Sequence, residues 1–262
     1  MRENRLKALW AADRAALGGW LVLPSNISAE YMAHAGFDWL CIDMQHGSID
    51  YQVALSMLQA ISTTDTVPIV RVSWNEPGII MKTLDAGAYG VIVPMVNSRA
   101  EAEAAVAACR YAPQGNRSYG PGRVVLYAGS DYFRHANKTV LCICMIETRE
   151  AIERAEEIVS TPGLDAIYIG PSDLSVSLGL PPASDQDAPE FTSAIEKVLA
   201  ACKKHGVIAG AHCGTTDVAK KRISQGFRFV QMADDAGALV RSSMASLAAM
   251  GDRSGTAPET TA

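Results

Sequence analysis

The chain of 262 residues lacks several features that would assign it to a common class of protein. No stretch approaches the roughly 18 consecutive apolar residues of a membrane-spanning helix, so no such helix is expected. No basic run is present and the net charge is -5, which argues against a nucleic-acid partner. Residues 1–20 lack the long apolar core of a secretory signal and are predicted to form an amphipathic helix. We therefore expect a cytoplasmic protein.

A Cys-X-X-Cys motif is also missing, although the chain has six cysteines. Most of them lie in apolar, strand-like runs such as WLCID and LCICMIE, which is typical of buried, reduced thiols. Cys213 follows His212 directly, but adjacent residues of a strand point to opposite faces, so a zinc site at this pair is disfavoured.

The chain does have a regular alternation of short apolar runs and longer segments with helical spacing. The runs are continuously hydrophobic, as strands buried on both faces are. They cover 20–24, 37–44, 68–73, 90–96, 140–147, 164–171, 207–213 and 227–233. Eight such units in a chain of this length predict an α/β fold, a single closed (β/α)8 barrel. The alternative, an open doubly wound sheet, normally has a Gly-rich phosphate turn after its first strand, and LVLPSNIS has none.

Helix boundaries are marked by residues that cap helix ends. Ser98 and Thr215 precede helical segments, and four segments end on glycine, as a left-handed cap requires. These glycines are Gly36, Gly87, Gly206 and Gly226.

Two long segments, 111–137 and 171–189, interrupt the alternation. The first is rich in Gly, Tyr and Arg and is predicted to be a functional loop. We expect the barrel domain to occupy residues 1–250 and the polar tail 251–262 to be disordered.

Carboxylates follow two consecutive strands of the predicted barrel, at the end where barrel active sites form. Glu147 ends one run and Asp173 follows the next. Neighbouring strands are about 4.8 Å apart, so these side chains are placed to share a cation. Two carboxylates without a thiolate or imidazole favour a hard ion, Mg²⁺ or Mn²⁺. The alternative is that each residue only caps the helix that follows it.

Two further polar side chains lie at strand ends. Arg71 interrupts an apolar run, and a buried guanidinium needs an anion. It is predicted to hold a substrate carboxylate, or to form a structural ion pair with Asp43 or Glu147, and the two roles are compatible. His46 directly follows the second strand and is a candidate for proton transfer, with a structural role as the alternative.

Five segments together resemble the 4-hydroxy-2-oxoheptanedioate aldolase family of class II pyruvate aldolases. They are FDWLCIDMQHG, PIVRVSWNEP, LDAGAYGVIVPMV, MIETREAIE and AIYIGPSDLSVSLG, and the resemblance runs from about residue 5 to about residue 250. It implies a TIM barrel of the phosphoenolpyruvate/pyruvate superfamily and a homohexamer assembled as a trimer of dimers. It also implies a role in the catabolism of aromatic compounds or sugar acids, as in the related 2-keto-3-deoxy-sugar-acid aldolases.

The resemblance also implies roles for individual residues. Glu147 and Asp173 match the ligands of a divalent metal ion, for which Mg²⁺, Mn²⁺ and Co²⁺ are candidates. Arg71 matches the arginine that holds the oxo acid, and His46 matches the catalytic acid/base. Asp85 matches an aspartate that supports this histidine from a neighbouring subunit.

Three more positions complete the implied site. The main-chain N–H groups around Ser172 and Asp173 match those that bind the substrate carboxylate, and Asp43 matches an acid near the metal-bound water. Gln45 stands where many members have Glu, in a substrate-binding position. Glutamine keeps the size and hydrogen bonding of Glu but removes its charge and any base function, which predicts slower proton transfer or a different substrate.

The resemblance thus implies reversible aldol addition between a 2-oxo acid, pyruvate or hydroxypyruvate, and an aldehyde. No lysine lies in the predicted strands, whereas Schiff-base aldolases need a desolvated one. The segment 111–137, with Arg117, Tyr119 and Arg123, is predicted to cover the aldehyde side or to form subunit contacts. The alternatives are a thioester lyase like citrate lyase β or malyl-CoA lyase, a decarboxylase similar to macrophomate synthase, and a non-catalytic binder of 2-oxo acids.

Overall fold

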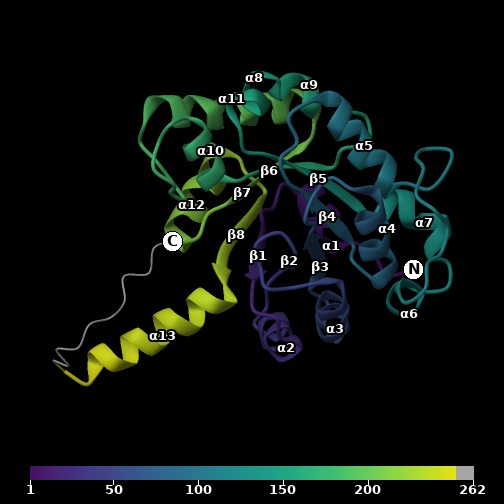
Figure 1. Ribbon diagram of the computed structural model, residues 1–262, viewed down its shortest axis with the longest axis horizontal. Coiled ribbons are helices and arrows are strands. Elements are labelled where there is room, and N and C mark those ends of the chain that lie inside the picture. The colour runs from purple at the N-terminus through teal and green to yellow at the C-terminus, as the bar shows by residue number, and fades with distance from the viewer. Residues whose placement is uncertain (252–262) are drawn as a thin grey trace.

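The computed structural model describes residues 1–251, in which eight parallel strands close into a barrel in the order of the sequence (Figure 1). The strands are β1 (Ala16–Leu21), β2 (Trp39–Asp43), β3 (Val67–Arg71), β4 (Gly90–Val93), β5 (Leu141–Ile146), β6 (Ala166–Ile169), β7 (Ile208–His212) and β8 (Phe229–Asp234). Each strand pairs with the next, and β8 pairs with β1. The predicted barrel is confirmed, and the open sheet is wrong. The predicted tail, 251–262, lies outside the described residues except for Gly251.

Helices follow the strands and cover the outside of the barrel (Figure 1). They are α1 (Arg5–Ala11), α2 (Asn26–His34), α3 (Tyr51–Ile61), α4 (Pro77–Ala86), α5 (Arg99–Cys109), α6 (Val124–Ala128), α7 (Tyr132–Thr139), α8 (Arg149–Glu153), α9 (Ala155–Val159), α10 (Pro171–Ser177), α11 (Pro189–His205), α12 (Thr216–Gln225) and α13 (Asp235–Ala249). The last helix, α13, extends away from the barrel. Within residues 1–251, no helix is both long enough and apolar enough to cross a membrane.

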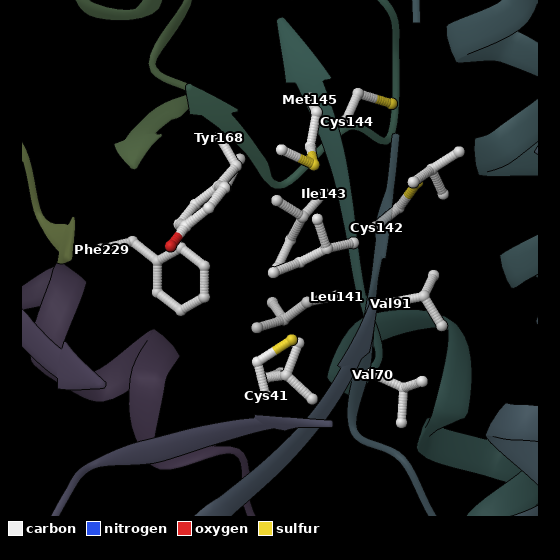
Figure 2. Packing of buried hydrophobic residues seen from close by; sticks show 14 of the residues in the cluster. Cys41, Val70, Val91, Leu141, Cys142, Ile143, Cys144, Met145, Tyr168 and Phe229 are labelled. Atoms are coloured by element: carbon white, nitrogen blue, oxygen red, sulfur yellow. The ribbon is translucent and has the colours of Figure 1, made fainter. Parts of the chain in front are cut away.

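The barrel interior is filled with side chains rather than open. Figure 2 shows Cys41, Ile143, Met145, Tyr168 and Phe229 pointing into one packed cluster. All six cysteines are buried and free, as predicted. Because both faces of each strand are covered, the strands of a parallel barrel appear in the sequence as uninterrupted apolar runs.

The prediction for residues 1–20 is wrong in its second half. The helix α1 ends at Ala11, and β1 begins at Ala16, four residues before the predicted start of that strand at Trp20. Two glycines in β1 give a weak strand signal, but the packing requires one of them. A Cβ on Gly18 would lie 2.0 Å from the Trp39 side chain of the neighbouring strand.

The segment 111–137 is not a continuous loop, because it contains α6 and most of α7. Likewise the segment 171–189 begins with α10. The helix-capping predictions are confirmed. The Ser98 and Thr215 hydroxyls accept hydrogen bonds from the main-chain N–H groups of Glu101 and Val218. The four predicted glycines all have positive φ angles.

Candidate active site

A pocket opens where the barrel strands end. It is lined by His46, Arg71, Met145, Glu147, Gly170, Pro171, Ser172, Asp173 and His212. The fold therefore brings together five of the residues predicted from the sequence, from four different βα units. Barrel enzymes build their active sites at this end of the strands.

Glu147 directly follows β5, and its carboxylate is buried in the pocket wall. One carboxylate oxygen, Oε1, accepts a hydrogen bond of 2.7 Å from the main-chain N–H of Met95. Met95 has a φ of 55°, a left-handed conformation that is unusual for a residue other than glycine and is found at functional sites. The predicted alternative, that Glu147 caps the next helix, is wrong, because the Thr148 hydroxyl does so.

The other oxygen of Glu147, Oε2, is buried and has no hydrogen-bond partner within residues 1–251. Burial, together with the nearby charge of Asp173, raises the pKa of Glu147 to about 7. Space for this carboxylate exists because residue 170 is glycine: a Cβ there would lie 2.3 Å from Oε2. A buried carboxylate oxygen without a donor is costly unless a cation meets it.

Asp173 lies in the first turn of α10, which begins where β6 ends. Its carboxylate is exposed at the pocket, and the main-chain N–H groups of Ser172 and Asp173 belong to the same first turn, where N–H groups have no partner within the helix. The short helix after β6 is as predicted. The turn therefore presents both a carboxylate and main-chain donors to the pocket.

Arg71 ends β3 and forms a buried, two-pronged ion pair with Asp43 at the end of β2. Its Nε and Nη2 atoms donate to the two carboxylate oxygens at 2.9 Å and 2.6 Å. Trp20 donates to the same carboxylate at 3.1 Å, and the main-chain N–H groups of Gln45 and His46 also donate to it. Burial by itself raises the pKa of Asp43, but these hydrogen bonds, led by that of Arg71, bring it below its ordinary value.

The predicted ion pair of Arg71 is thus present, and it does not use the whole guanidinium. Nη1 faces the sulfur of Met145, a pocket residue, at 4.0 Å. A sulfur atom is a weak acceptor, so this nitrogen is available to an anion. The structural role and the predicted substrate role are therefore compatible in one side chain.

His46 is exposed at the pocket, whereas Gln45 beside it does not line the pocket. The side-chain oxygen of Gln45 is buried and lacks a hydrogen-bond partner in the described part of the chain. Asp85 is also absent from the pocket lining. It lies in the last turn of α4 and pairs with Arg117 at 2.6 Å.

His212 lines the pocket, but we did not predict it as a site residue. It ends β7, the position in a barrel strand that supplies site residues, and that position was the available signal. Its immediate neighbours in the sequence, Ala211 and Cys213, gave no signal of a role in substrate binding. The zinc site considered for His212 and Cys213 is not formed: no group of three or more His, Cys, Asp or Glu side chains is arranged to hold a metal among residues 1–251.

The two carboxylates fit a hard divalent cation. In the described part of the chain no donor meets one buried oxygen of Glu147, and Asp173 adds a second carboxylate from the neighbouring strand end. Ions such as Mg²⁺ commonly take one or two carboxylates and complete their shell with water and substrate oxygens. Two protein carboxylates are therefore enough to hold such an ion.

The chain is similar to known proteins over most of its length. Residues 17–242 match the family described as HpcH/HpaI aldolase/citrate lyase. The hydroxypyruvate/pyruvate aldolase of Rhizorhabdus wittichii is 44% identical over 232 residues, which cover 88% of this chain and 92% of that protein. The 4-hydroxy-2-oxo-heptane-1,7-dioate aldolase of Escherichia coli is 38% identical over 254 residues, which cover 95% of each. A crystal structure of a HpcH/HpaI aldolase/citrate lyase family protein from Burkholderia cenocepacia has a TM-score of 0.89 at 33% identity, covering 95% of this chain and 99% of that one.

Proposed function

Because this chain belongs to the HpcH/HpaI aldolase/citrate lyase family, we propose that it catalyses a divalent-metal-dependent aldol reaction between a 2-oxo acid and an aldehyde. Membership confirms the predicted resemblance and makes the chain a carbon–carbon lyase. The names of its relatives support pyruvate or hydroxypyruvate as the nucleophile.

The observation that carries the proposal is the buried oxygen of Glu147, which has no hydrogen-bond partner among residues 1–251 and lines the same pocket as Asp173. We assign these two carboxylates as the ligands of the ion, with Mg²⁺, Mn²⁺ or Co²⁺ as candidates. When bound, such an ion polarises the keto oxygen of the substrate and lowers the cost of forming an enolate at C3.

The charge of the 2-oxo acid is matched by groups that the fold already holds in place. Nη1 of Arg71 is free to approach an oxygen atom, because Asp43 occupies the other two guanidinium nitrogens. The N–H groups of Ser172 and Asp173 bind the substrate carboxylate at the start of α10. A guanidinium already ordered by an ion pair loses little further freedom when substrate arrives.

His46 is the proton carrier. In the addition direction it donates a proton to the new alkoxide oxygen, and in cleavage it removes the proton from that hydroxyl. Its exposure at the pocket leaves it open to the aldehyde and to another subunit. Gln45 does not line the pocket and its side-chain oxygen is buried, so we assign it an indirect role in placing the loop that carries His46.

We also propose a homo-oligomer, with a hexamer as the expected form. Asp85 lies outside the pocket of its own subunit, which is in keeping with a role beside His46 of a neighbour. Residues 238–249 of α13 are all exposed and include Leu239, Met244 and Leu247. Because exposed apolar side chains in such number are typical of interfaces, a second copy is the expected cover.

Arg117 and Arg123 hold the segment 111–137 onto the barrel. Arg117 bonds to Asp85, and Arg123 donates to the main-chain oxygen of Ala86. These contacts lie outside the pocket of the same subunit, so they favour the role in subunit contacts over a cover for the aldehyde within one subunit. The exposed Tyr119 is available to such a contact.

The test is hydrogen exchange at C3 of the 2-oxo acid. Metal-stripped protein is mixed with pyruvate, or with hydroxypyruvate, in D₂O with and without Mg²⁺ or Mn²⁺, and the C3 proton signals are followed by NMR. We expect loss of signal only with metal, and a loss of at least about 100-fold in rate for Glu147→Gln, because the oxygen that meets the ion is no longer charged.

The matched control is Glu150→Gln, which changes an exposed glutamate in the next helix. It should exchange at the rate of the unchanged protein. Exchange by metal-free protein, or full activity in Glu147→Gln, would contradict the assignment. Absence of exchange with both oxo acids would contradict the proposed function itself.

A further inference from the structure

His212 has no role in the aldol chemistry described above, yet its imidazole forms part of the pocket wall. The ring packs edge-on against Trp20, with centroids 5.0 Å apart and an interplanar angle of 88°. The guanidinium of Arg71 lies over the same Trp20 ring, 5.0 Å from its centroid. His212 is therefore placed in the same region of the pocket as the arginine assigned to the oxo acid.

The end of β7 is held rigidly behind this side chain. The buried Gln231 of β8 accepts hydrogen bonds from the main-chain N–H groups of Cys213 and Gly214 at 3.2 Å and 2.9 Å. His212 and Gln231 are also register partners across the two strands. A side chain on a fixed backbone, packed against an aromatic ring, is suited to a directional contact with substrate.

The hydrogen bond of His212 determines which ring nitrogen carries the proton. Tyr168 is completely buried, and its hydroxyl lies 3.5 Å from Nδ1 of His212. Among residues 1–251 the hydroxyl has no other hydrogen-bond partner, so we assign it as the donor and Nδ1 as the acceptor. The neutral ring then carries its hydrogen on Nε2.

The imidazole is neutral at the pH of the cell. Burial, with a contribution from the positive charge of Arg71, lowers the pKa of His212 to about 4. Asp43 and Asp234 act in the opposite direction. The side chain lines the pocket as an uncharged N–H donor, and Nε2 has no acceptor within the described residues.

We propose that His212 is a specificity-determining residue that donates from Nε2 to a substrate hydroxyl group, either on a carbon of the bond being made or broken or on the carbon next to it. The charged oxygens of the substrate already have partners in Arg71, the N–H groups of α10 and the ion. A neutral donor beside a guanidinium is better matched to a neutral oxygen than to a second carboxylate. The inference rests on the proposed function, since it concerns the substrate of the same site.

Two substrate hydroxyls have this chemistry, namely the C3 hydroxyl of hydroxypyruvate and the C2 hydroxyl of a 2-hydroxyaldehyde. Two measurements distinguish them. The first compares hydroxypyruvate with pyruvate, through dissociation constants and C3 exchange rates without aldehyde. The second uses pyruvate as the nucleophile and compares aldol rates for glycolaldehyde with those for acetaldehyde.

The informative variants are His212→Phe, which keeps a ring and removes the donor, and His212→Gln, which keeps an N–H donor at a similar reach. For His212→Phe we expect the preference for the hydroxylated substrate to fall about 5- to 20-fold in one of the two comparisons, the usual effect of one hydrogen bond. His212→Gln should retain the preference to within about threefold. His34→Phe, an exposed histidine on α2, is the matched control and should change neither.

A second variant tests the assigned tautomer. Tyr168→Phe removes the hydroxyl that donates to Nδ1, so the proton is no longer confined to Nε2. We expect this variant to lose part of the same preference, between the values for the unchanged protein and for His212→Phe. An unchanged preference in Tyr168→Phe would contradict the tautomer assignment.

The result that overturns the proposal is an equal change for hydroxylated and unsubstituted substrates in His212→Phe, or no change in either comparison. An equal loss would mean that His212 only supports the fold, which thermal unfolding of the variant measures independently. The dissociation constants are measured without turnover. If the unchanged protein binds both oxo acids but exchanges neither, the proposed function fails while this inference is still tested by binding.

Discussion

Arg71 and Asp43 show how one ion pair serves both stability and the site. Both side chains are buried, and Asp43 accepts from Arg71, Trp20 and two main-chain N–H groups. Removing one partner of such a pair leaves a buried charge, which costs about 3–5 kcal/mol. The geometry of Arg71 at the pocket therefore depends on a carboxylate that need not touch the substrate.

The pH dependence of stability follows from the same pair. The pKa of Asp43 is lowered in the folded state, so the unfolded chain takes up its proton first as the pH falls. The stabilisation is present above the ordinary Asp pKa of 3.8 and is lost as the pH falls through the lower, folded value. Urea unfolding at several pH values below about 5 should show this loss.

The variant Asp43→Asn isolates the contribution. It should unfold about 3–5 kcal/mol more easily near neutral pH and show a flatter pH dependence in acid, because the titrating group is gone. Asp50→Asn, at the exposed N-cap of α3, is a control that keeps a capping side chain. If the free energy of unfolding of Asp43→Asn falls with decreasing pH as steeply as that of the unchanged protein, other carboxylates cause the acid dependence.

At the scale of elements, β1 depends on a close approach of two strands. The register pairs Gly18 with Trp39 of β2, and the Trp39 ring stacks on Phe229 of β8 at 4.0 Å. The missing side chain of Gly18 thus makes room for an aromatic ring shared by three strands. Glycine has a low strand propensity, so the sequence pattern placed the start of this strand at Trp20. The structure begins β1 at Ala16.

We expect Gly18→Ala to be strongly destabilising. The added Cβ would lie 2.0 Å from the Trp39 ring, so either the ring or the strand must move, which costs about 1–3 kcal/mol or more. Gly122→Ala, where nothing lies within 4 Å of the new Cβ, should change little. Chemical denaturation of both variants decides the point, and a neutral Gly18→Ala would mean that the ring adapts without cost.

At the scale of the whole molecule, α13 is the element that a single chain does not explain. Asp235 at its start is buried and accepts a hydrogen bond from the N–H of Val22. The rest of α13 extends away from the barrel (Figure 1), and its residues 238–249 are exposed. A helix that exposes several apolar side chains to water is unfavourable in a single subunit. A neighbouring copy is the cover that the proposed oligomer provides.

The double variant Leu239→Ser, Leu247→Ser tests this. We expect sedimentation to show a smaller assembly, because two apolar side chains of the contact become polar. Activity should fall together with the assembly if Asp85 acts in a neighbour's pocket, whereas metal binding by Glu147 and Asp173 should persist. Ser242→Ala and Ser246→Ala, on the same helix, are the controls. An assembly unchanged in size would show that α13 lies outside the contact.

The sequence by itself determined the barrel and the polar residues at its mouth. Both are local signals: apolar runs of strand length, and Glu147, Asp173, Arg71 and His46 at the points where the runs end. Hydrophobic periodicity and position in the sequence reveal these features, because each feature depends only on a residue and the strand to which it belongs. The resemblance of the motifs to a known family then indicated which reaction these residues serve.

Only the tertiary structure decided how these residues are partnered. The N–H of Met95 meets Glu147 from a different βα unit, and the hydroxyl of Tyr168 meets His212 across two strands. Such contacts join residues far apart in the chain, and closure of the barrel brings them together. Local sequence patterns cannot report them, because the burial and the hydrogen bonds that set charge and tautomer arise only when β8 closes on β1.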